Sequence, residues 1–72
     1  MATSMGRVKG VNGNMVTVEF DSAIAKNEVG FIHVGDERLK GEVIRIKGNE
    51  AALQVFEMTG GVSVGDHVEF TG

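Results

Sequence analysis

The sequence predicts an all-β fold: a small, closed, six-stranded β-barrel with an internal pseudo-two-fold repeat. Eleven glycines divide the 72 residues into short segments rich in apolar residues. Several segments alternate apolar and polar residues with the period of two that a half-buried strand shows. Similar residues also recur at an offset of 35. A barrel is favoured over a sandwich because closure leaves no unpaired edge strands in so small a protein.

Six segments carry strand signals. Residues 15–20 alternate most cleanly, with Val16, Val18 and Phe20 on one side. In the fourth segment the adjacent apolar pair Val43-Ile44 breaks the alternation, as a β-bulge would. The predicted strands are residues 6–11, 15–20, 29–34, 39–46, 51–56 and 67–70.

The intervening segments carry turn and loop signals. Asn12-Gly13 is predicted to fill the two central positions of a type I′ hairpin turn. Residues 47–50 form a second predicted turn, and residues 58–64 a glycine-containing loop. Residues 21–28 are the one stretch that could form a helical turn, although it is too short to be stable alone.

The length allows one domain at most. The opening segment Met1 to Ser4 is followed by a second methionine, Met5, which suggests that the first four residues were added to express the protein. We therefore expect residues 1–5 to be disordered, order to begin near Gly6, and residues 6–72 to form a single β-barrel domain.

The internal repeat relates the two halves of the chain. At an offset of 35, Gly and Val of the first predicted strand match those of the fourth, and glycines match in the turns and loops. Because Gly and Val are abundant, chance is the alternative explanation. The main matches are Gly6-x-Val8 with Gly41-x-Val43, Gly13-Asn14 with Gly48-Asn49, and Val29-Gly30 with Val64-Gly65.

The core is predicted from the inward positions of the strands, which include Val16, Val18, Leu53 and Val55. Since the chain has no Trp or Tyr, most of its four phenylalanines are expected in the core rather than on a surface that stacks nucleic-acid bases. Phe56 is the weakest candidate because Leu53 and Val55 mark the other face of its strand. The remaining three are Phe20, Phe31 and Phe70.

Composition excludes several classes of function. The absence of cysteine rules out disulfides and thiolate zinc sites. The formal net charge is -3 and the basic residues are scattered, which argues against nucleic-acid binding. No apolar run approaches the ~18 residues of a membrane span, so no direct membrane insertion is expected. The start of the chain also lacks the basic and apolar regions of a signal peptide.

No motif predicts catalysis, cofactor binding or metal binding. The stretch from Gly60 to His67 has the glycine spacing of a phosphate loop, but Asp66 stands where the lysine is needed and no helix follows. The two histidines lack metal-ligand spacing and have no serine beside them for a nucleophilic triad. The polar residues considered were His33, His67, Ser4, Ser22, Ser63, Asp36, Glu37 and Glu57.

The second half of the chain resembles a known family. The similarity lies in a Gly-Glu-Val-Ile-Arg strand at 41–45, a Gln-Val-Phe-Glu-x-Thr stretch at 54–59, and a Gly-Val-x-x-Gly-Asp turn at 61–66. These segments resemble the N-terminal barrel of the catalytic A subunit of V/A-type ATPases, and Gly6-Arg7-Val8 adds to the likeness. Asn14 departs from the family pattern, where Pro often follows the turn glycine.

The resemblance implies a structural role in a larger enzyme. In this family the nucleotide-binding domain lies downstream, so this chain alone is not expected to be an enzyme. Barrels of alternating A and B subunits form a crown that holds the hexamer together, which makes the adjacent B-subunit barrels the implied partners. The parent would be cytoplasmic and peripheral to the membrane, and the isolated chain would be a monomer. The alternatives are a free-standing SH3-like or OB-like binding module and the equivalent domain of the B subunit.

Overall fold

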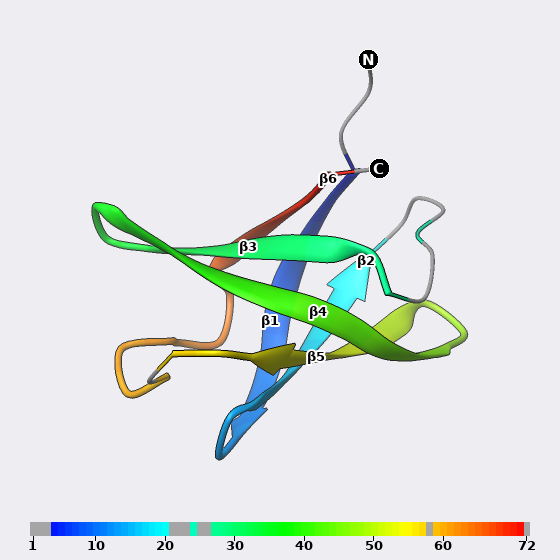
Figure 1. The fold of residues 1–72 in the computed structure, drawn as a ribbon, viewed down its shortest axis with the longest axis horizontal. Coiled ribbons are helices and arrows are strands. Elements are labelled where there is room, and N and C mark those ends of the chain that lie inside the picture. Colours follow the sequence, from blue (N-terminus) through cyan, green and yellow to red (C-terminus); the bar gives the residue numbers. More distant parts are fainter. Residues whose placement is uncertain (1–3, 21–23, 25–26, 58, 72) are drawn as a thin grey trace.

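The fold is a closed antiparallel β-barrel of six strands (Figure 1). It is taken from a computed structural model that describes residues 4–20, 24, 27–57 and 59–71. Around the barrel the strand order is β1-β2-β5-β4-β3-β6, with β6 closing onto β1. The predicted fold class is therefore confirmed. The strands are β1 (Ser4–Asn12), β2 (Met15–Phe20), β3 (Val29–Val34), β4 (Glu37–Lys47), β5 (Glu50–Val55) and β6 (His67–Thr71).

β2 and β3 have the predicted limits, whereas β1, β4, β5 and β6 differ from them by one or two residues. β1 begins at Ser4 rather than Gly6, because Ser4 and Met5 pair with the end of β6. Residues 1–3 lie outside the described residues, and the expectation that residues 1–5 are disordered stays a prediction. β5 ends at Val55, which leaves Phe56 just beyond the strand.

All three two-residue hairpin turns place glycine at the first central position. Asn12 pairs with Met15, so the central residues of the first turn are Gly13 and Asn14, and the prediction of an Asn12-Gly13 centre is wrong. Gly13 has φ +63°, and Asn14 does not have a positive φ. This is the pattern of a type II′ turn rather than type I′. The turns at Gly48-Asn49 and Gly35-Asp36 have the same arrangement, with positive φ at the glycine alone.

The internal repeat is real in the two long hairpins. Each residue pair of the β1–β2 hairpin recurs 35 residues later in the β4–β5 hairpin, from Gly6↔Phe20 and Gly41↔Val55 to the turns. Both hairpins carry a bulge at the same place, and Val43-Ile44 is the predicted one. The bulge in β1 has Lys9 as its extra residue.

The third strand of each half follows a different offset. β1 pairs with β6 through Gly6↔Val68, and β4 pairs with β3 through Gly41↔Gly30, so Gly30 corresponds to Val68, 38 residues later. The predicted match of Val29-Gly30 with Val64-Gly65 is therefore wrong. Its cause is the loop before β6, which spans residues 56–66 and is three residues longer than the loop at 21–28.

The two loops nevertheless form equivalent hydrogen bonds to the barrel. Asn27 and Gly65 are equivalent, and both have positive φ, +74° and +98°. The Asn27 N–H donates to the Val43 carbonyl at 2.7 Å, and the Gly65 N–H donates to the Val8 carbonyl at 2.8 Å. Of the expected helical turn at 21–28, residues 21–23 and 25–26 lie outside the described residues, and the described part of the chain contains no helix.

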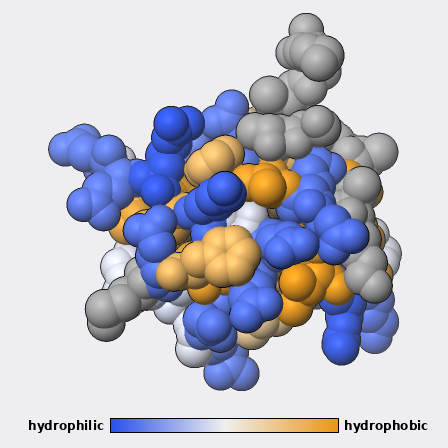
Figure 2. Space-filling model, in the orientation of Figure 1, coloured by the Kyte–Doolittle hydropathy of each residue, from blue (hydrophilic) through white to orange (hydrophobic). Residues whose placement is uncertain are grey.

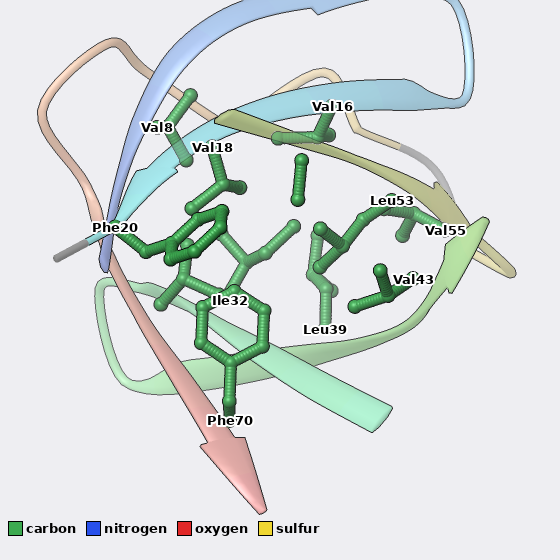
Figure 3. Packing of buried hydrophobic residues seen from close by; sticks show 12 residues of the cluster. Val8, Val16, Val18, Phe20, Ile32, Leu39, Val43, Leu53, Val55 and Phe70 are labelled. Atoms are coloured by element: carbon green, nitrogen blue, oxygen red, sulfur yellow. The ribbon is translucent and has the colours of Figure 1, made fainter. Parts of the chain in front are cut away.

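One apolar cluster fills the barrel, and the labelled side chains converge on its centre (Figure 3). The four predicted inward residues are confirmed, with exposures between 0 and 2%. Phe20 and Phe70 meet edge to face, with ring centroids 6.4 Å apart. The core members are Val8, Val16, Val18, Phe20, Ile32, Leu39, Val43, Ala51, Leu53, Val55, Val68 and Phe70.

The core prediction fails for two phenylalanines. Phe31 is only half-buried, because its neighbour Ile32 takes the inward position and the Arg38 guanidinium lies over its ring, 5.2 Å from the centroid. Phe56 lies past the end of β5 and is 61% exposed, as its position opposite the Leu53 and Val55 face suggested.

Candidate functional site

The glycine loop at 60–67 uses its acidic residue to hold its own shape. The Asp66 carboxylate accepts a hydrogen bond from the Ser63 N–H at 2.8 Å. The Asp66 carbonyl accepts one from the Val8 N–H, also at 2.8 Å. The loop connects β5 to β6, so its backbone donors are not presented at the start of a helix, as a phosphate loop requires.

The histidines and acidic residues considered from the sequence lie on the barrel surface. His33 is half-buried on β3, and its Nε2 lies 3.4 Å from Glu69 Oε1 on β6. His67, Asp36, Glu37 and Glu57 are exposed. Within the described residues no three His, Asp or Glu side chains gather in a way that could hold a metal ion. Ser22 lies outside the described residues.

Lys9, the extra residue of the β1 bulge, sits at the centre of a charged cluster. Its Nζ lies 2.7 Å from Glu50 Oε2 and 3.9 Å from Glu19 Oε2. The hydrogen bond and charge of Glu50, with a smaller contribution from Glu19, raise the pKa of Lys9 above 10.5. All three side chains are about half exposed, so water weakens their attraction and the cluster contributes little to stability. We call Lys9, Glu19 and Glu50 the charged trio.

The second bulge carries uncharged residues at the equivalent positions. Ile44 is its extra residue, and it replaces Lys9. Met15 and Gln54 pair across β2 and β5 at the places that correspond to Glu50 and Glu19. Ile44 and Met15 are half-buried. We call Ile44, Met15 and Gln54 the uncharged trio.

Phe56 adds an exposed aromatic ring beside the uncharged trio. It follows Gln54 by two residues, which is the spacing of side chains on one face of a strand. With Gly13, Asn14 and Thr59 it lines an open depression beside the first hairpin turn. The Thr59 hydroxyl donates to the Gly13 carbonyl at 2.6 Å and ties the loop to that turn.

Sequence reasoning identified neither trio as a surface feature. Both could have been found by aligning the two halves and comparing outward residues as well as inward ones.

The face of the barrel in Figure 2 presents small apolar patches among hydrophilic side chains. In residues 4–20, 24, 27–57 and 59–71 no helix has the length and hydropathy needed to cross a membrane.

Known proteins are similar to this chain in sequence. The family model described as "ATP synthase alpha/beta family, beta-barrel domain" matches residues 8–72. The chain is 61% identical over all its 72 residues to the V-type ATP synthase alpha chain 1 of Treponema pallidum, and 56% identical over 72 residues to the V-type ATP synthase alpha chain of Treponema denticola. Over 66 residues, 92% of this chain, it is 58% identical to the V-type ATP synthase alpha chain of Borreliella burgdorferi.

The chain spans 12% of the length of these relatives. It corresponds to their N-terminal barrel. Because the relatives are alpha chains, neither a free-standing binding module nor a B-subunit barrel is favoured. The closed six-stranded barrel and the family match over residues 8–72 together show that this chain belongs to the ATP synthase alpha/beta family, as its β-barrel domain.

Proposed function

We propose that this barrel serves as an assembly collar in a V/A-type rotary ATPase that couples ATP hydrolysis or synthesis to proton or sodium transport. The observation that carries the proposal is the match to V-type ATP synthase alpha chains over the whole length of this chain. In this role the barrel lies next to B-subunit barrels in a hetero-hexamer. As part of the parent complex, this domain lies in the cytoplasm and is peripheral to the membrane.

The architecture suits a structural role in a complex whose other domains move. Every strand pairs on both sides, so the barrel has no open edge that ATP-driven movements could peel away. The described core is entirely apolar and contains no buried polar or charged side chain. A domain of this kind contributes through its outer surface, since its interior is filled.

The test is removal of the barrel from the full-length subunit. The subunit with and without residues 1–72 is mixed with its partner subunits, and assembly is followed by native mass spectrometry. We expect the shortened subunit to bind ATP but to form few or no hexamers. Hexamers of normal yield and stability without the barrel would contradict the proposed function.

A further inference from the structure

We propose that the outer face formed by the uncharged trio and Phe56 is the surface that docks onto the barrel of a neighbouring subunit. We call these four residues, Met15, Ile44, Gln54 and Phe56, the uncharged face. This inference rests on the proposed function, and it names the part of the barrel that performs it. The partner surface it fits has an apolar centre, a hydrogen-bonding group for Gln54 and charged groups of both signs at the rim.

The comparison between the two hairpins singles out this face. The hairpins share the same residue pairing and the same bulge, so their backbones present side chains in the same way. One hairpin surface carries Lys9, which satisfies its charge with Glu50 and Glu19 on the barrel itself. The other carries Ile44 and Met15, which leave apolar surface at the same place. Burial against a partner releases more free energy for apolar surface than for charges that are already paired with each other.

Gln54 joins the members of the uncharged face. It pairs directly with Met15 on β2 and with Glu42 on β4. Phe56 directly follows β5 and is 61% exposed, a large apolar area for a side chain of this size. The margin carries charges of both signs: Glu42 and the exposed Glu57 are acidic, and the exposed Lys40, whose carbonyl accepts the Phe56 N–H, is basic. A partner with charged groups of both signs fits this margin.

The rest of the parent subunit leaves from the other side of the barrel. In the order β1-β2-β5-β4-β3-β6, β5 and β6 are three strands apart in either direction. The ends of the chain run along β1 and β6, which pair through Ser4↔Phe70 (Figure 1). The segment that follows β6 in the longer relatives therefore starts opposite β5, whereas β1 adjoins β2 and lies two strands from β5. A different subunit is the better candidate to cover the uncharged face.

The size of the barrel argues against a second copy of this chain as the occupant. A standard interface buries about 800 Å² on each partner, which is nearly a fifth of the 4539 Å² that the barrel exposes and more than four side chains can supply when two of them are half-buried. Contact through this face is too small to hold a stable dimer alone. It suits subunits that are also held together elsewhere, and the isolated chain is expected to be a monomer.

The test transplants the charged trio onto the uncharged face. The variant Met15→Glu/Ile44→Lys/Gln54→Glu places at each position the side chain that the equivalent position already accommodates. The matched control is the reverse exchange, Lys9→Ile/Glu19→Gln/Glu50→Met. Both are made in the full-length subunit, and affinity for the partner subunits is measured by sedimentation. Chemical denaturation of both 72-residue variants reports whether the barrel itself stays folded.

We expect the transplanted variant to fold and to assemble at least about tenfold more weakly, while the control assembles as the unchanged subunit does. If the transplanted barrel unfolds, the single variant Phe56→Ser takes its place, because that exposed side chain is not needed by the core. Unchanged assembly of the tested variant, or equal loss in the control, would overturn the face assignment.

The proposed function and this inference fail in different ways. If removal of the barrel abolishes hexamers but the transplanted variant assembles normally, the collar function stands and the uncharged face is wrong. If removal of the barrel has no effect, the collar function itself is wrong. A dimer of the isolated chain at micromolar concentration, lost in the transplanted variant, would show that the occupant is a second copy and would overturn the choice of partner.

Discussion

Lys9 and Ile44 occupy the same position in two copies of one hairpin, each as the extra residue of a β-bulge. The backbone that surrounds them is shared down to the hydrogen bonds of the turns: Phe20 N–H donates to the Asn49 carbonyl and Val55 N–H to the Asn14 carbonyl, both at 2.9 Å. The side chains differ in charge. The repeat therefore conserves the inside of the barrel and its turns, while the outside of each half is free to acquire a different partner.

Truncation of Leu53 should remove much of the stability of the barrel. Leu53 is fully buried and belongs to the single apolar cluster. We expect Leu53→Ala to lower the free energy of unfolding by about 2–5 kcal/mol, because the side chain leaves a cavity. Chemical denaturation measures the loss. The control Gln54→Ala, at the adjacent exposed position, should change stability by less than about 0.5 kcal/mol.

Two glycines of β1 should respond differently to an added methyl group. A Cβ at Gly6 would lie 2.7 Å from the backbone oxygen of Glu19 and 2.8 Å from Val18 Cγ1, which is too close to tolerate. Gly6→Ala should therefore cost about 1–3 kcal/mol. A Cβ at Gly10 meets nothing within 4 Å, so Gly10→Ala should leave stability unchanged or raise it by up to about 1 kcal/mol. Thermal unfolding of the two variants compares them, and equal losses would contradict the close packing at Gly6.

The pKa of Lys9 should depend more on Glu50 than on Glu19. Carboxylates favour the charged ammonium, and Glu50 is the closer of the two. We expect Glu50→Gln to lower the pKa of Lys9 toward 10.5, and Glu19→Gln to lower it less. Since the folded-state pKa is raised, the stabilisation is fully present below pH 10.5 and is lost as the pH rises through the folded-state value. NMR titration of the lysine side chains measures these shifts, and a larger effect from Glu19→Gln would refute the assignment.

The isolated chain should neither bind ATP tightly nor hydrolyse it. Turnover needs a lysine for the β- and γ-phosphates and ligands for magnesium. The nearest stretch offers Asp66, whose carboxylate is already bonded to the Ser63 N–H. Replacement of Asp66 by lysine should not create a site, because the loop leads into a strand. Calorimetric titration with magnesium-ATP and a phosphate-release assay are the direct measurements, and micromolar binding or turnover would reopen an enzymatic role.

The fold class and the core could be predicted from the sequence because both follow from local periodicity. Val16, Val18, Leu53 and Val55 alternate with polar residues, and a strand turns alternate side chains to opposite faces whatever its neighbours are. The broken alternation at Val43-Ile44 likewise gave the bulge. The family could be predicted because the segments at 41–45, 54–59 and 61–66 are specific in residue type and order.

Register and surface depended on the tertiary structure. The first turn centres on Gly13 and Asn14 because Asn12 pairs with Met15 in the sheet. The turn preferences of individual residues carry no information about which residues pair across the strands. The third strands correspond at an offset of 38 because the barrel fixes their pairing with β1 and β4, so extra residues in a loop shift the repeat without disturbing closure. The uncharged face exists only once β2, β5 and β4 lie side by side, since Met15 on β2 is far along the chain from Ile44 and Gln54.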